Sequence, residues 1–87
     1  MIKREITITN KTGLHARPAS MFVQTAGKFK SSVTIEKEDK TINAKSIISV
    51  LSGGIGQGTK ITLVIDGEDE QEAEKALVEL IESNFGE

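Results

Sequence analysis

The sequence predicts an α+β domain in which helices cover one face of a mostly antiparallel sheet. Strands are indicated where apolar and polar residues alternate, and helices where apolar residues recur at i, i+3, i+4 and i+7. In chain order these patterns give strand, helix, strand, strand, helix, strand and helix. The chain has 87 residues, fewer than the roughly 100 to 150 of a typical domain, so we expect a single domain over residues 1–87.

Four segments have the alternation of strands. The first runs from Ile2 toward Ile8 and is expected to be half-buried, and Ser32–Lys37 and a short segment around Ile42 form a hairpin. Lys60–Asp66 is rich in β-branched residues and is expected to be a central strand. The apolar positions assigned to the sheet are Ile2, Ile6, Ile8, Val33, Ile35, Ile42, Ile61, Leu63 and Ile65.

Three segments have helix signals. A helix is expected to begin near Ala16, to carry Pro18 in its first turn and to stop at Gly27. Its core positions are Ala19, Phe22, Val23 and Ala26, and Phe29 is expected to lead the chain back into the core. Ser46 is a candidate N-cap for a short helix that extends through Leu51 and ends at Gly53-Gly54.

The last helix follows Gly67. Asp69 and Glu72 have the spacing of a capping box in which Asp replaces Ser or Thr, and the first turn is acidic, as the positive end of a helix dipole favours. The apolar stripe expected to face the core consists of Ala73, Ala76, Leu77, Leu80 and Ile81.

Composition excludes several classes of protein. The chain has no cysteine and one histidine, so we expect no disulfide, no metal site and no cofactor. No run approaches the roughly 18 apolar residues of a membrane span, and the first ten residues lack the apolar block of a signal peptide, so a cytoplasmic protein without membrane insertion is expected. The net charge of −2 does not favour nucleic-acid binding.

Charge is unevenly distributed along the chain. Six cations and one anion give residues 1–30 a charge of +5, whereas nine anions and one cation give residues 66–87 a charge of −8. The amino-terminal part therefore attracts anions. We interpret the acidic part as the solvated face of the last helix.

The single histidine, His15, falls where a turn of residues 10–13 meets the first helix. A helix start presents unpaired N–H groups and partial positive charge, and Arg17 adds a guanidinium suited to phosphate. The same field disfavours a charged imidazolium, which leaves a neutral ring nitrogen as a nucleophile. These residues predict a histidine that accepts a phosphoryl group and passes it on.

The alternative is that His15 only caps the helix and that Arg17 is a solvated cation, and this local pattern leaves both interpretations open. The sequence has no second histidine and no Ser-His-Asp set, so a stand-alone hydrolase is disfavoured. The glycines at positions 53, 54, 56 and 58 fit no nucleotide-binding loop and are interpreted as turn residues.

Ser46 is a second candidate site, because phosphate added there would change a nearby binding surface by its charge. Its alternative role is that of an ordinary N-cap. Ile48 points about 100° away from Ile47 around the helix axis, so we expect it to be partly exposed and able to anchor a partner protein. Lys45 adds electrostatic steering toward an acidic partner. The residues expected to share the other face are Ile47, Val50 and Leu51.

Three segments carry a family resemblance: NKTGLHARPA at residues 10–19, NAKSII at residues 43–48 and GEDEQEA at residues 67–73. With these segments the chain closely resembles the HPr family, the histidine-containing phosphocarriers of the bacterial phosphoenolpyruvate-dependent sugar phosphotransferase system. The match extends nearly from end to end. Two motifs at the family's separation are more specific than either motif alone.

The resemblance implies an open-faced β-sandwich of four antiparallel strands in the order 1-4-2-3, with three helices on one face. It implies that His15 receives a phosphoryl group through Nδ1 from phosphorylated enzyme I and donates it to a IIA domain, while Arg17 stabilises the phosphorylated ring. A monomer that meets its partners transiently is expected. The implied docking surface comprises Ala16, Arg17, Ser20, Ile47, Ile48 and Leu51.

Ser46 matches the serine that HPr kinase/phosphorylase modifies in Gram-positive relatives, which slows transfer at the histidine and recruits the regulator CcpA. Ile48, Ser49 and Gly53 depart from the methionine or phenylalanine, the glycine and the leucine that are common there. These departures concern the regulator's surface and leave phosphotransfer untouched. Relatives without the histidine are only regulatory. A regulatory effector read through Ser46, and a carrier in a nitrogen-regulatory chain, are the two alternatives.

Overall fold

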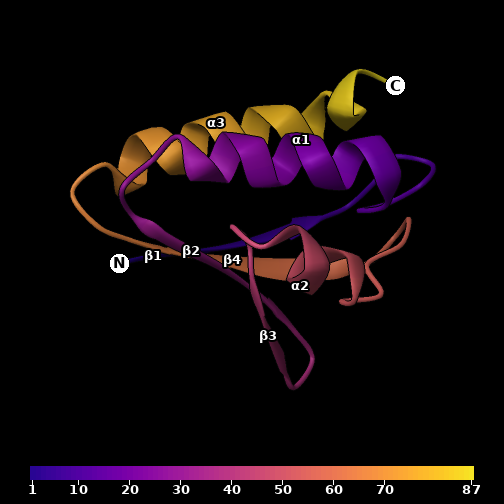
Figure 1. Ribbon diagram of the computed structural model, residues 1–87, viewed down its shortest axis with the longest axis horizontal. Helices are drawn as coiled ribbons and strands as arrows, with labels where there is room; N and C mark the ends of the chain where they lie inside the picture. Colours follow the sequence, from indigo (N-terminus) through magenta and orange to yellow (C-terminus); the bar gives the residue numbers. More distant parts are fainter.

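Four strands and three helices occur in the predicted order in the computed structural model, which describes residues 1–87. The strands form one sheet in the order β1-β4-β2-β3, and every neighbouring pair is antiparallel. Helices α1 and α3 extend side by side along one side of the sheet (Figure 1). The predicted open-faced β-sandwich is confirmed. The elements are β1 (Ile2–Thr7), α1 (Ala16–Gly27), β2 (Ser32–Lys37), β3 (Lys40–Asn43), α2 (Ile47–Leu51), β4 (Lys60–Asp66), α3 (Glu70–Glu82) and the 3₁₀ turn η1 (Asn84–Gly86).

The core forms where the apolar faces of the sheet and of the helices meet. The inward residues of β2 and β4 pair across the strands, with Ile35 opposite Leu63 and Val33 opposite Ile65, and all four are buried. Strand β1 lies at the edge of the sheet, and its residues Ile2 and Ile6 are half-buried, in keeping with the half-buried strand that was expected. The helices contribute a buried set that includes Ala19, Phe22, Ala26, Ala73, Leu77 and Ile81.

Two details of the helix faces differ from the sequence prediction. Val78, outside the predicted stripe, is buried, whereas Ala76 and Leu80 are half-buried. The buried stripe of α3 is therefore rotated toward Val78 relative to the predicted one. Phe29 and Val23 are also half-buried and pack against the edge of the core.

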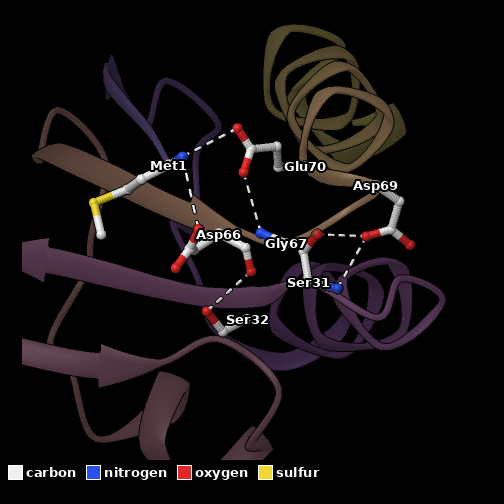
Figure 2. A network of polar contacts seen from close by, with 7 residues as sticks. All are labelled: Met1, Ser31, Ser32, Asp66, Gly67, Asp69 and Glu70. Atoms are coloured by element: carbon white, nitrogen blue, oxygen red, sulfur yellow. Dashed lines mark hydrogen bonds and ion pairs between the residues drawn. The ribbon is translucent and has the colours of Figure 1, made fainter.

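The predicted capping box at the start of α3 is wrong. Asp69 occupies the N-cap position, but its carboxylate makes no hydrogen bond to the helix. It accepts instead from the Ser31 hydroxyl, from the Ser31 N–H at 2.9 Å and from the Lys30 N–H at 2.9 Å. Figure 2 shows Asp69 facing the connection between α1 and β2. Without Asp69, these donors of the α1–β2 connection would have no partner. The carboxylate therefore joins the α1–β2 connection to the β4–α3 connection.

These hydrogen bonds also set the acidity of Asp69. The Ser31 hydroxyl contributes most and the Lys30 N–H comes next, and together with the Ser31 N–H they lower the pKa of the carboxyl from 3.8 to about 2. Each of these donors favours the ionised carboxylate. The contact between the two loops is therefore complete only when Asp69 is charged.

Glu70, and not Glu72, binds the backbone that precedes α3. Its carboxylate accepts from the Gly67 N–H at 3.1 Å and lies 3.2 Å from the Met1 ammonium. The Gly67 N–H, followed by the ammonium, lowers the pKa of Glu70. Asp66 lies 3.6 Å from the same ammonium, so the β4–α3 connection is bound to the start of β1 (Figure 2).

Candidate functional site

His15 is exposed at the N-terminus of α1. Its backbone is extended, with φ −129° and ψ 157°, and its side chain makes no hydrogen bond to the helix. His15 therefore occupies the N-cap position, as the alternative interpretation expected, but its imidazole caps no N–H group and stays free. The first N–H groups of the helix have no side-chain partner, so the helix start next to His15 keeps its partial positive charge.

Ala16 connects His15 to the helix in a strained conformation. Its φ of +51° lies in the left-handed region, which costs a residue with a side chain about 1–2 kcal/mol. Pro18 and Ala19, which follow, are buried and fix the first turn against the core. The chain therefore turns sharply at the site and leaves His15, Ala16 and Arg17 at the surface. Strain of this kind persists only where the surrounding structure enforces it.

Arg17 is exposed, and its guanidinium takes part in none of the ion pairs of the molecule. It lines a pocket together with Pro18 and Met21 of α1 and with residues 85–87 of the carboxyl-terminal segment. Its donors are thus available to an anion. Residues 85–87 were not predicted to be part of the site, because Phe85 lies beyond the last predicted helix. Its backbone is left-handed, with φ 55°, and its side chain is buried.

The loop before His15 is held at several points. The Gly13 backbone has φ +66°, and the Leu14 N–H donates to the Ile55 carbonyl at 2.8 Å. The side chain of Asn10 is buried and donates to the Gly13 carbonyl at 3.0 Å. The predicted turn is therefore present, but the role of Asn10 was missed, because asparagine side chains are mostly exposed in folded proteins.

Helix α2 lies beside α1 and exposes apolar side chains. Ser46 is the N-cap, as predicted, and its Oγ accepts from the Ser49 N–H at 3.3 Å. Ile48 is 75% exposed, more than the partial exposure that was expected. Of the residues expected on the other face, Val50 is fully buried, whereas Ile47 and Leu51 are 38% and 41% exposed.

Two lysines that flank α2 have structural contacts. The Lys45 ammonium donates to the Phe29 carbonyl at 2.7 Å, so the side chain predicted to steer partners is held against the end of α1. The Lys37 ammonium donates to the Gly54 carbonyl at 2.8 Å and to the Gly53 carbonyl at 3.2 Å. Lys37 thus supports the end of α2, a role that the sequence pattern did not indicate.

The elements bring together the two halves of the predicted docking surface. Ala16 and Arg17 are exposed at the start of α1, and Ser20 is half-buried one turn later and accepts from the Gln24 side chain at 3.3 Å. The three exposed apolar residues of α2 stand on the neighbouring helix. No group of three or more His, Cys, Asp or Glu side chains is arranged to hold a metal ion. None of the helices combines the length and apolarity that crossing a membrane requires.

Comparison with known proteins agrees with this geometry. The family model described as "PTS HPr component phosphorylation site" matches residues 2–83. The HPr-like protein Crh of Halalkalibacterium halodurans is 50% identical over 94% of this chain and 98% of its own length. The phosphocarrier protein HPr of Xylella fastidiosa is 48% identical over 100% of this chain and 98% of its own.

Solved structures give the same result. A crystal structure of HPr from Thermoanaerobacter tengcongensis superposes with a TM-score of 0.98 at 57% identity, and the match covers 100% of this chain and 98% of that chain. An HPr dimer from the same organism has a TM-score of 0.81 at 57% identity, with 100% of both chains covered. Because the family model matches residues 2–83, nearly the whole chain, the chain belongs to the HPr family of phosphotransferase-system phosphocarriers.

Proposed function

We propose that His15 is the residue that carries the phosphoryl group, taking it from phosphorylated enzyme I and donating it to a IIA domain for sugar uptake and phosphorylation. In the first transfer the lone pair of neutral Nδ1 attacks phosphorus, and the bond from phosphorus to the donor breaks with its electrons. In the second transfer the P–N bond of His15 breaks in the same way. The observation that carries the proposal is an exposed histidine at an uncapped helix start beside an unpaired arginine.

The surroundings of His15 suit both transfers. The free N–H groups of α1 and the Arg17 guanidinium offset the charge of phosphohistidine without burying it. Because both groups lie at the surface, water screens their attraction and keeps the P–N bond labile. The chain then acts as a carrier that partner enzymes load and discharge, and it catalyses no turnover of its own.

The docking surface follows from the neighbouring helices. Exposed apolar side chains next to a reactive group are the anchors that a partner protein buries, and α2 provides three of them. Lys45 and the six cations of residues 1–30 favour an acidic partner face. The encounter is transient and involves the monomer. The proposed contact residues are Ala16, Arg17, Ser20, Ile47, Ile48 and Leu51.

Ser46 is the proposed regulatory site. Its hydroxyl stands at the edge of the same apolar surface, so a phosphate there would add negative charge beside Ile48. Such a charge repels an acidic partner and slows transfer at His15. HPr kinase/phosphorylase is the proposed modifying enzyme, and a CcpA-type regulator would read the phosphate on a patch altered at Ile48, Ser49 and Gly53.

A regulatory effector is the second candidate, favoured by the 50% identity to an HPr-like Crh protein. In that case Ser46 alone would be modified and His15 would be vestigial. A carrier in a nitrogen-regulatory chain would share the His15 chemistry and differ only in its partners. The cytoplasmic location remains a prediction from the sequence.

The test is phosphorylation by phosphoenolpyruvate and enzyme I, followed by mass spectrometry and an acid-lability assay, with His15→Ala in parallel. One acid-labile phosphoryl group, absent from the variant and transferable to a IIA domain, is the expected result. An unmodified wild-type chain, together with Ser46 labelling by HPr kinase and ATP, would make the effector role the better account.

A further inference from the structure

We infer that Asn10 is a positioning residue for phosphoryl transfer, which fixes the loop that presents His15. The inference rests on the proposed role of His15 as acceptor. It concerns how the ring is held in place and adds no group to the chemistry itself.

Asn10 is an unusual occupant of its site. Only two polar residues of the molecule are buried, Asn10 at 2% exposure and Ser31 at 1%. The Asn10 amide nitrogen donates to the Gly13 carbonyl at 3.0 Å and to the Thr12 hydroxyl at 3.4 Å. Its Oδ1 is buried without any hydrogen-bond partner.

This incomplete bonding argues against a purely stabilising role. A buried carbonyl oxygen without a partner is costly, and an apolar side chain of similar volume would avoid that cost. Ser31 makes the contrast, because its hydroxyl and its N–H both donate to Asp69. The contacts that distinguish Asn10 are those of its amide nitrogen, and both are to the loop before His15.

Those contacts remove the freedom of the backbone that leads to His15. Gly13 is bound to Asn10 through both of its backbone groups, because its N–H also donates to the Asn10 carbonyl at 3.2 Å. Leu14 is fully buried, and its N–H donates to the Ile55 carbonyl. His15 therefore starts from a fixed backbone. A reacting atom held in place before the encounter avoids the entropic cost of ordering it during transfer.

A second set of contacts extends the same network to the far wall of the Arg17 pocket. The Thr12 hydroxyl, which accepts from Asn10, donates to the Glu87 carboxylate at 3.0 Å. Glu87 also lines that pocket. Asn10 is thus connected to both sides of the site, to His15 through Gly13 and to the pocket through Thr12.

The test compares Asn10→Ala with Ser31→Ala, a control that removes a hydrogen bond of the other buried polar residue at the start of β2. Initial rates of phosphorylation by enzyme I are measured over a range of enzyme I concentrations, and amide exchange of Leu14 is measured by NMR. Asn10→Ala is expected to lower the maximal rate about tenfold or more, with an apparent KM within about twofold of wild type because the contact side chains are intact. Leu14 is expected to exchange faster.

Asn10→Asp extends the test, because it keeps the unpartnered oxygen but places a second oxygen against the Gly13 carbonyl. It is expected to slow transfer more than Asn10→Ala does. Ser31→Ala should lower the melting temperature and leave the rate and the Leu14 exchange unchanged. If Asn10→Ala does not fold, Asn10→Leu, which has a similar volume and no hydrogen-bond donor, takes its place in the same assays.

Two results would overturn the inference: wild-type maximal rates in the folded Asn10 variants, or a loss of rate that Ser31→Ala shares in proportion to its loss of stability. The proposed function fails separately, if wild type itself receives no phosphoryl group on His15. In that case Leu14 exchange still reports whether Asn10 holds the loop.

Discussion

Replacing Gly13 by alanine tests the geometry of the loop that carries His15. Gly13 is buried at φ +66°. A Cβ built on it would lie 2.6 Å from Gly56 Cα and 2.8 Å from Gly56 C, with the Ile55 carbonyl oxygen closer still. All three atoms are backbone, so no side-chain rotation can relieve the clash.

The expected cost has two parts. Left-handed backbone costs a residue with a side chain about 1–2 kcal/mol, and forcing a methyl group into a packed site costs about 1–3 kcal/mol. Gly13→Ala should therefore destabilise the fold by about 2–5 kcal/mol. Since about 1 kcal/mol shifts the melting temperature of a domain of this size by roughly 4–8 °C, a fall of at least roughly 8 °C is expected in a thermal melt followed by circular dichroism.

Gly58→Ala is the matched control. Gly58 has φ +87°, but a Cβ on it would have no heavy atom within 4 Å, so this variant experiences the backbone strain without the clash. Gly13→Ala should exceed it by the clash contribution of about 1–3 kcal/mol, and it should also slow the phosphorylation of His15. Equal melting temperatures for the two variants would refute the reasoning, because they would show that the loop does not lie against residues 55 and 56.

Three further predictions concern charge and packing. Arg17→Ala should slow phosphoryl transfer about tenfold, the loss of about 1.4 kcal/mol of transition-state stabilisation, with an unchanged melting temperature because the side chain is exposed; wild-type rates would remove Arg17 from the mechanism. Phe22→Ala should destabilise by roughly 3–5 kcal/mol because the ring is fully buried; chemical denaturation measures this, and an unchanged midpoint would mean that the ring is not in the core. The pKa of Asp69 is about 2 in the folded chain and ordinarily 3.8, so its contribution to stability is complete above that ordinary value and is lost as pH falls through about 2. Asp69→Asn should therefore reduce the loss of stability that wild type shows over this acidic range. An identical loss in the variant would contradict the assigned hydrogen bonds.

Most of the fold could be predicted because its elements bury one face each. The alternation around Ile35 and Leu63 and the helical spacing around Phe22 reflect burial directly, and these residues are in the core. Burial at the edge of a helix face depends on tertiary neighbours, which is why Val23 was expected to be deeper than it is and why Val78 was missed. Periodicity within one element carries no information about such neighbours.

The prediction of a capping box for α3 failed for a related reason. Asp69 and Glu72 satisfy the local spacing of a capping box, but the carboxylate of Asp69 meets the unpaired donors of Ser31 and Lys30, 38 and 39 residues away. Side-chain oxygens bind the donors that tertiary structure brings to them. A local motif therefore gave the correct helix start and the wrong partners.

The candidate site was predictable where its residues are adjacent in sequence. His15, Arg17 and the N-cap Ser46 follow from helix-start chemistry, and the exposure of Ile48 follows from helical angle. The supporting residues Asn10, Thr12 and Glu87 were not found. The contact between Thr12 and Glu87 joins segments 75 residues apart, and a turn sequence gives no sign that its asparagine is buried. The contacts that support His15 could therefore be recognised only in the structure.

The central claim is that the imidazole of His15 carries the phosphoryl group, and NMR of the chain labelled with ¹⁵N at its single histidine tests it most directly. After treatment with phosphoenolpyruvate and enzyme I, the account predicts that one ring nitrogen, Nδ1, becomes coupled to phosphorus and that the coupling disappears when a IIA domain is added. A histidine spectrum that does not change under conditions that phosphorylate a reference HPr would contradict the account.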